Sequence, residues 1–222
     1  MSLESVRERV RAATARCGRN RDEVTLVIVT KGQSVETIRH LYEQGEREFG
    51  ENRAQELAIK VDRLPGDIRW HFVGLLQSNK VRIVRPSVKL LHSLDRPDLG
   101  PAWVKGPGLA PPALLQVNIG AEPQKHGVDP AEAIRVFGEL VSVGVDLVGL
   151  MAIPPAVADA EANRPLFREM QRLGQLVRDA HPRATDLSMG MTDDFEVAIE
   201  EGATLIRVGR AIFSDNEPFE AD

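Results

Sequence analysis

A lysine at the end of an apolar run is the first residue of this chain that could do chemistry. Residues 24–30 are all apolar or threonine, which is typical of a strand buried on both faces. Lys31 follows directly. An ammonium group beside a core must pair, reach solvent along its stem or lose its proton, and a neutral lysine amine attacks carbonyl groups to form an imine. Two interpretations stay open here: an imine-forming nucleophile, or the commoner lysine whose stem reaches the surface.

Two glycine-containing turns near the end of the sequence could hold an anion. The turn Ser188-Met-Gly-Met-Thr192 precedes a helical pattern, and Gly209-Arg210 opens a short helical turn. Glycine permits close backbone approach, and N–H groups at helix starts attract anions. The pattern predicts a phosphate cup formed by Ser188 with the backbone of Gly209 and Arg210. Two glycine turns without a ligand are the equally weighted alternative.

Arg207 lies inside the last apolar segment, residues 203–208. A buried arginine needs a partner, stays protonated and only donates hydrogen bonds. Facing the nitrogen of a pyridine ring, it would hold the ring without giving up a proton, and the ring would then be a poor electron sink. The alternative is a structural ion pair with a neighbouring acid.

The histidines offer no metal site. No pair among the five has the spacing of metal ligands with another His, Asp or Cys, so we expect no metal. His71 and His92 fall within apolar segments, and for both we favour a hydrogen-bonded core histidine.

Eight strand-like segments alternate with helical patterns, after a leading amphipathic helix from Leu3 to Cys17. Such alternation predicts a parallel sheet, and eight units predict one closed (β/α)8 TIM barrel with an extra N-terminal helix, spanning residues 1–222 as a single domain. An open doubly wound sheet is the alternative, but no dinucleotide fingerprint or phosphate loop follows any strand. The barrel brings the loops after the strands to one mouth. The expected strands are residues 24–30, 47–50, 68–73, 88–93, 113–117, 145–150, 185–188 and 203–208.

Three of the connecting segments give more specific predictions. Residues 100–112 carry four prolines and are expected to form a loop. Pro130 begins a helix, and Thr192 or Asp193 caps a helix that runs through Glu200. The helix from Pro130 is expected to turn inward the apolar residues Ile134, Phe137, Leu140 and Val141.

Composition narrows the class of protein. The chain has 222 residues, 42% hydrophobic and 27% charged, with a net charge of −5, so nothing attracts nucleic acid or an anionic membrane. No apolar run approaches the roughly 18 residues of a spanning helix, and no secretory signal begins the sequence. The single cysteine, Cys17, has no partner for an internal disulfide. We therefore expect a cytoplasmic protein.

Taken together, the motifs resemble the pyridoxal phosphate (PLP) homeostasis protein family, whose members are barrels similar to the N-terminal domain of alanine racemase. The resemblance covers almost the whole chain, with the motifs in family order. They are residues 26–31, 49–53, 70–74, 76–80, 92–95, 117–127, 149–151, 187–191 and 207–213.

The resemblance implies a fold-type III PLP-binding barrel in which Lys31 carries PLP as a Schiff base, the internal aldimine. It also implies Ser188, Gly209 and Arg210 at the phosphate, Arg207 at the pyridine nitrogen and Asn52 near the ring. No residue is assigned a catalytic role. The partners it implies are PLP and PLP-dependent apoenzymes, and we expect a monomer.

The sequence departs from the family pattern at three places. After Lys31 the family usually continues Thr-Lys or Val-Gln and a proline, whereas this chain has Gly32-Gln33-Ser34. Thr192 stands where serine is common, and Ser214 where glycine is common. The first departure could alter the loop beside the lysine; the others remove no expected PLP contact.

Three functions compete: a PLP carrier without proper turnover, a PLP-dependent amino-acid racemase, and a lysine-imine aldolase without PLP. A racemase needs a second base, which in alanine racemase-like enzymes is a tyrosine supplied through an added domain and a partner subunit. The sequence ends soon after the last strand, and its only tyrosine, Tyr42, lies on the apolar side of a helix. An aldolase would leave the phosphate cup and Arg207 without a joint purpose. We favour the carrier.

Overall fold

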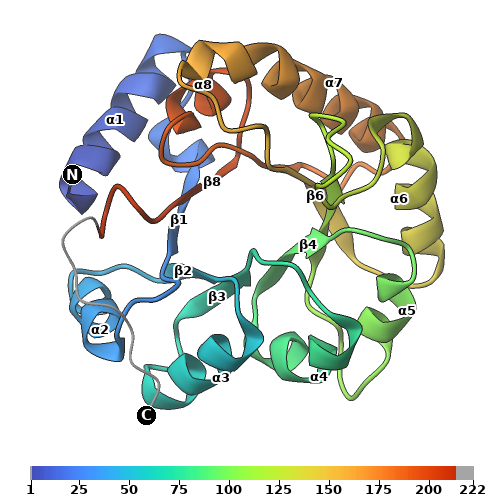
Figure 1. Ribbon diagram of the computed structural model, residues 1–222, viewed down its shortest axis with the longest axis horizontal. Helices are drawn as coiled ribbons and strands as arrows, with labels where there is room; N and C mark the ends of the chain where they lie inside the picture. The colour runs from blue at the N-terminus through green and yellow to red at the C-terminus, as the bar shows by residue number, and fades with distance from the viewer. Residues whose placement is uncertain (1, 214–222) are drawn as a thin grey trace.

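Eight parallel strands close into a barrel in the computed structural model, which describes residues 2–213. Each strand pairs with the next along the chain, and β8 pairs with β1 to close the ring (Figure 1). The predicted TIM barrel is therefore confirmed, whereas Ser214 lies outside the described residues. The strands are β1 Thr25–Val29, β2 Glu48–Glu51, β3 Arg69–Phe72, β4 Leu90–Leu94, β5 Ala113–Val117, β6 Leu147–Ala152, β7 Asp186–Ser188 and β8 Leu205–Val208.

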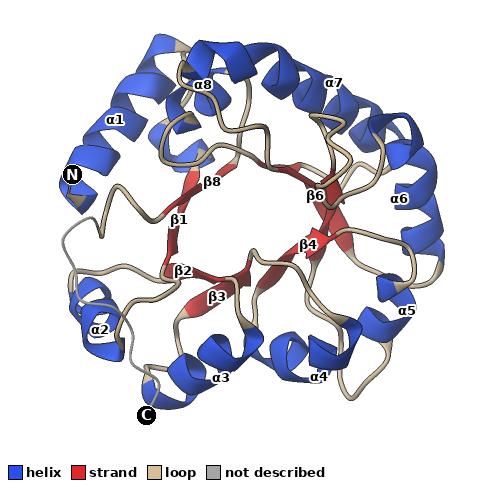
Figure 2. Ribbon diagram, in the orientation of Figure 1, coloured by secondary structure: helices blue, strands red, loops and turns tan. Residues whose placement is uncertain are grey.

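The helices form an outer ring around the strands, as Figure 2 shows. The extra N-terminal helix α1 is present and packs beside α8 (Figure 1). The α-helices are α1 Leu3–Arg16, α2 Val35–Glu43, α3 Ala54–Arg63, α4 Val81–Val84, α5 Leu99–Val104, α6 Ala133–Ser142, α7 Arg164–Ala180 and α8 Phe195–Glu200.

Apolar side chains pack on both faces of the strands, as expected for a parallel sheet covered by helices. The larger core lies between the strands and the helices and includes Leu187 and Ile206. A smaller cluster combines alternate residues of five strands: Val27, Leu90, Leu114, Met151 and Leu205. Because side chains alternate between faces along a strand, this second cluster fills the barrel interior.

Three segment predictions were wrong in detail. Residues 100–112 were expected to be a loop, but α5 occupies Leu99–Val104, because Leu99 and Trp103 lie one turn apart and both are fully buried. Its proline falls in the first turn, where no backbone hydrogen bond is lost.

The inward face of α6 is shifted by one residue from the prediction. Ile134 is 41% exposed and Val141 is 36% exposed. The buried face instead follows the helical spacing set by Phe137, which is fully buried. Its members are Ala133, Val136, Phe137 and Leu140.

The start of α8 also differs from the prediction. The helix begins at Phe195 rather than after a Thr192 or Asp193 cap. Asp194 precedes it, and its carboxylate accepts a hydrogen bond from the backbone N–H of Met191 at 2.8 Å and from Asn163 Nδ2 at 3.0 Å. The turn after β7 is therefore closed by a side chain from within the turn, and the helix starts later.

Gly149 on β6 gives a stability prediction. It pairs with Asp186 of β7, and a Cβ at this position would lie 1.9 Å from the Asp186 carbonyl oxygen. Since both atoms belong to strands of a closed barrel, relaxation is restricted, and we expect Gly149→Ala to lower the free energy of unfolding by about 3 kcal/mol or more. Urea denaturation would measure the change. Gly138→Ala, in a helix with open space around the new methyl group, should stabilise by about 0.5–1 kcal/mol.

Candidate functional site

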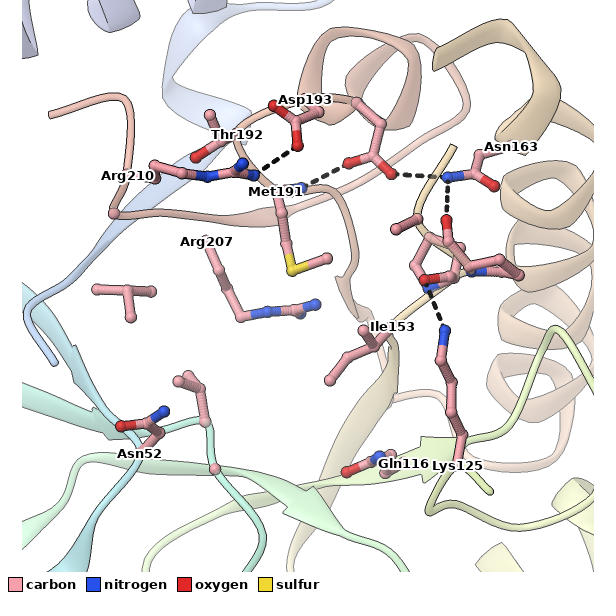
Figure 3. A pocket seen from close by; sticks show the side chains of 18 of the residues that line it. Asn52, Gln116, Lys125, Ile153, Asn163, Met191, Thr192, Asp193, Arg207 and Arg210 are labelled. Carbon is pink, nitrogen blue, oxygen red and sulfur yellow. Dashed lines mark hydrogen bonds and ion pairs between the residues drawn. The ribbon is translucent and has the colours of Figure 1, made fainter. Parts of the chain in front are cut away.

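A cavity of about 600 Å³ opens at the carboxyl ends of the strands. Its walls come from segments that follow β1, β2, β3, β5, β6, β7 and β8, which is where active sites of such barrels lie. Figure 3 shows the polar side chains that reach it, with Arg207 between the β7 turn and the β2 end. Its cationic lining residues are Lys31, Lys125, Arg207 and Arg210, and its acidic ones are Asp193 and Asp194.

The structure brings together five of the six residues expected to bind a cofactor. Lys31, Asn52, Arg207, Gly209 and Arg210 all line the cavity. Lys31 is exposed, so its stem reaches the cavity from the strand end and is not held in the core.

Ser188, the sixth predicted residue, does not line the cavity. It is fully buried, and its hydroxyl contacts His92 Nδ1 at 2.8 Å and the Arg207 guanidinium. Thr192, four residues later, does line the cavity and is labelled in Figure 3. The role of Ser188 at a phosphate stays a prediction. Its hydroxyl already bonds to His92 and Arg207, so a direct contact with a phosphate would compete with these two hydrogen bonds.

Arg207 is 4% exposed and donates from Nη2 to the carbonyl oxygen of Ala152 at 2.9 Å, as well as to Ser188. Burial lowers the pKa of Arg207 to about 10, with the charge of Asp194 opposing that change. The guanidinium therefore stays protonated at neutral pH. Its contacts are a hydroxyl and a carbonyl, so the structural ion pair considered as an alternative is not what holds it.

A buried polar cluster, not anticipated from the sequence, supports the backbone on either side of Lys31. Lys60 is fully buried, and its ammonium donates to the Thr30 carbonyl at 2.7 Å, to Glu51 Oε1 at 2.6 Å and to Glu56 Oε1 at 2.6 Å. Glu56 also accepts the backbone N–H of Gly32 at 2.6 Å. The residues before and after the lysine are thus both tied to one cluster.

The sequence did carry a signal for this cluster. Lys60 lies three residues after Leu57 and four before Leu64, so it sits on the apolar stripe of α3. A charge on such a stripe needs a buried partner. The unusual Gly32 also has a place here, since its φ of 71° is a left-handed conformation that glycine adopts without strain.

The turn after β7 is braced against its surroundings. Asp194 holds the turn as described above, and Arg210 donates to Asp193 Oδ2 at 2.6 Å, linking the turns after β7 and β8 (Figure 3). Asn163 donates further to the Pro155 carbonyl at 3.0 Å, which connects the β7 turn to the segment after β6. Three of the cavity walls are therefore fixed to one another.

At the opposite ends of the strands, Glu48 gives a prediction about acid stability. Burial acts to raise its pKa, but hydrogen bonds from His71, Arg69 and Lys89 outweigh burial and lower the pKa from 4.5 to about 2. A depressed carboxyl pKa stabilises the fold above the unfolded value, and that stability is lost as the pH falls toward the folded value. We expect Glu48→Gln to reduce the loss of stability between pH 4.5 and 2. Parallel denaturation series of the two proteins would measure it; identical slopes would contradict it.

Comparison with known proteins identifies the family. The model of the alanine racemase N-terminal domain matches residues 1–217. A protein of Aquifex aeolicus, named pyridoxal phosphate homeostasis protein, is 39% identical in an alignment of 221 residues that covers 97% of each chain. A Deinococcus radiodurans protein of the same name is 40% identical over 225 residues, covering 96% of this chain and 100% of that one. This chain belongs to the pyridoxal phosphate homeostasis protein family.

Solved structures agree with the family assignment. A protein of Bifidobacterium adolescentis, described as unknown, superposes with a TM-score of 0.90 at 35% identity and covers 95% of this chain and 92% of its own. PipY of Synechococcus elongatus, a structure with PLP bound, has a TM-score of 0.75 at 32% identity and covers 94% and 99%. The barrel and the family recognised from the motifs are thereby confirmed.

No helix within residues 2–213 is both long and apolar enough to cross a membrane. The same residues contain no group of three or more His, Cys, Asp or Glu side chains arranged to hold a metal ion.

Proposed function

We propose that this chain binds PLP through Lys31 and serves as a PLP carrier rather than as a catalyst. The observation that carries the proposal is the juxtaposition of Lys31 and Arg207 at one cavity. Lys31 follows β1, and Arg207 lies on β8, which pairs directly with β1 in the register Val27 opposite Arg207. A family relative of the same fold was solved with PLP bound.

The residues of the cavity fit PLP in their donor set and in their space. The cofactor needs an amine for its aldehyde, donors for its phosphate and a partner for its ring nitrogen; the cavity offers Lys31, a cationic wall and Arg207. Asn52 Oδ1 is buried without a hydrogen-bond partner among the described residues, which leaves an acceptor available to a ligand. At Gly209 a Cβ would lie 2.7 Å from the Val29 carbonyl oxygen, so a side chain there would close the gap between the strand ends.

PLP bound to a lysine supplies an aldehyde carbon in exchangeable covalent linkage and a pyridine ring that draws electrons when protonated. Arg207 keeps its proton, and a guanidinium only donates, so it would hold the ring nitrogen without protonating it. The cations around the cavity mouth favour the phosphate. Lys31 extends from a backbone that the Lys60 cluster fixes on both sides. These residues bind and orient; none of them supplies strong electron withdrawal.

The proposal of a carrier without proper turnover has a second support. Tyr42, the only tyrosine, donates from its hydroxyl to Asp67 at 2.7 Å and does not line the cavity, so it is no second base. We propose PLP-dependent apoenzymes as recipients, a monomeric state and a cytoplasmic location. Light scattering would test the monomer, and transfer of PLP to a purified apoenzyme would test the recipients.

The deciding experiment is uptake of PLP by the purified protein, followed by borohydride reduction and peptide mapping. We expect a visible absorption band that reduction bleaches, with one phosphopyridoxyl group on Lys31. Lys125→Ala is the matched control, because Lys125 also lines the cavity but donates to the Pro154 carbonyl at 3.1 Å. A protein that takes up no PLP, or a label that maps elsewhere, would refute the binding proposal.

Turnover distinguishes the carrier from the racemase. We expect the PLP-loaded protein to leave the chirality of amino acids unchanged over many equivalents of substrate. Racemisation that persists through purification and disappears in Lys31→Ala would establish an enzyme instead.

A further inference from the structure

A hydrogen-bonded chain runs through the barrel interior from the amino-terminal end of β2 to Arg207. Glu48 Oε2 lies 2.7 Å from His71 Nε2, and His71 Nδ1 lies 2.8 Å from His92 Nε2. His92 Nδ1 lies 2.8 Å from Ser188 Oγ, which also contacts the Arg207 guanidinium. The five residues come from five different strands, β2, β3, β4, β7 and β8. His71 and His92 were expected to be hydrogen-bonded core residues, and both are.

Burial lowers the pKa of both His71 and His92, and for neutral rings the two ends of the chain fix the direction of every hydrogen bond in it. Arg207 can only donate, and the ionised Glu48 can only accept. His71 must therefore present Nε2–H to Glu48, which leaves its Nδ1 to accept from His92 Nε2–H. The Nδ1 of His92 then accepts the proton of the Ser188 hydroxyl, whose lone pairs face Arg207. Both histidines are neutral and both carry the proton on Nε2.

The common direction of these hydrogen bonds offsets part of the free-energy cost of burying the Arg207 charge. Arg207 is 4% exposed, and its guanidinium donates to two neutral oxygens. An isolated buried charge is costly, whereas a chain of aligned dipoles strengthens each of its own links. Each link here turns its acceptor toward Arg207, and the chain ends on a carboxylate. Reversing one link would turn the positive end of that dipole toward the guanidinium.

We propose that Glu48, His71 and His92 are positioning residues for Arg207, acting through the hydroxyl of Ser188 to hold the guanidinium at the cavity wall. That the positioning of Arg207 serves PLP binding rests on the proposed function. The histidine tautomers and the rigidity of Arg207 do not depend on it. Ser188 thereby has a role as the link between the histidines and the arginine.

The first test uses the protein without any cofactor. Nitrogen-15 NMR at pH 7 distinguishes the two ring nitrogens of a histidine and detects an imidazolium. We expect both His71 and His92 as neutral Nε2–H tautomers. A proton on Nδ1 of either ring, or an imidazolium in either, would overturn the proposal.

The second test breaks the chain two links away from Arg207. We expect His71→Phe to speed hydrogen exchange of the Arg207 Nε–H by about tenfold. Exchange requires local opening, and opening is easier when Arg207 is no longer tied into a continuous chain of hydrogen bonds. His71→Gln should restore slow exchange, since its amide can donate to Glu48 and accept from His92. His181→Phe is the matched control: this histidine packs on Phe137 at a ring distance of 5.0 Å, outside the chain. Equal exchange in His71→Phe and the wild type would overturn the proposal.

PLP affinity of the same variants tests the link to the cofactor. We expect about tenfold weaker binding in His71→Phe, equivalent to about 1.4 kcal/mol, with recovery in His71→Gln. If the wild type takes up no PLP, the proposed function is wrong. The tautomers and the exchange rates would still decide whether the hydrogen-bonded chain positions Arg207. If His71→Phe does not fold, the wild-type tautomers and His71→Gln decide it.

Discussion

Replacing Lys60 by methionine is expected to destabilise the fold by about 3–5 kcal/mol, because it leaves buried carboxylates without their cation. Glu51 is fully buried and its Oε2 has no hydrogen-bond partner among the described residues. Its Oε1 receives Lys60 at 2.6 Å and the Thr30 hydroxyl at 2.5 Å. Methionine matches the length of the lysine stem, so the loss is chiefly one of charge. Urea denaturation at pH 7 would measure it.

The same variant has a pH signature. Burial raises the pKa of Glu51 above its ordinary 4.5, and Lys60 opposes that rise. Without Lys60 the pKa rises further, so the folded state holds a proton that the unfolded state has already released. Stability then falls as the pH rises above 4.5, and the deficit should be larger at pH 8 than at pH 5. Lys60→Met with Glu51→Gln should recover part of the loss. The exposed Lys105 gives the control Lys105→Met, expected within about 0.5 kcal/mol of wild type.

Lys31→Ala is expected to abolish the borohydride-reducible label completely, because no other amine takes its place at the end of β1. Residual binding should survive, since Arg207, Gly209 and Arg210 still line the cavity. We expect affinity for PLP to fall about a hundredfold, or roughly 2.7 kcal/mol. Absorption spectroscopy and equilibrium dialysis would measure the two effects separately.

The free energy of unfolding should distinguish Lys31→Ala from Lys60→Met. Lys31 is exposed, so Lys31→Ala should leave the free energy of unfolding of the protein without PLP within about 0.5 kcal/mol of wild type. Lys60→Met, by contrast, should weaken both the fold and the binding of PLP, because the cluster holds the backbone around Lys31. A Lys31→Ala protein that keeps a reducible label would show that the covalent anchor is elsewhere.

The strands could be predicted because each is a short apolar run whose signal is local. The lysine at the end of the first run and the arginine within the last could be assigned to one mouth by the barrel alone, and the cavity contains both. Which residues of α6 face inward could not be predicted from the local sequence pattern. Ile134 and Phe137 both suit an inward face by spacing, and only packing against neighbouring elements chooses between adjacent phases.

The partners of buried polar groups were the part that the sequence hid. Lys60 and Glu56 are four residues apart on one helix. Glu51 ends β2 and Thr30 directly follows β1, so only the fold brings them to Lys60. The histidine chain is hidden for the same reason. The inward direction of Ser188 follows from strand alternation once Leu187 is known to pack toward the helices, but the sequence alone does not say which of the two faces the barrel interior.

The pairing of β1 with β8 has a consequence for folding. The blue and red strands lie side by side in Figure 1, in the register Thr25 opposite Leu205, so contacts between the two ends of the barrel close a loop nearly as long as the chain. Closing so long a loop costs entropy before any contact rewards it. In a partly folded protein in which β1 and β8 are not yet paired, Lys31 and Arg207 do not lie at one cavity. A ligand held by both ends therefore stabilises only the closed barrel and drives its completion by mass action.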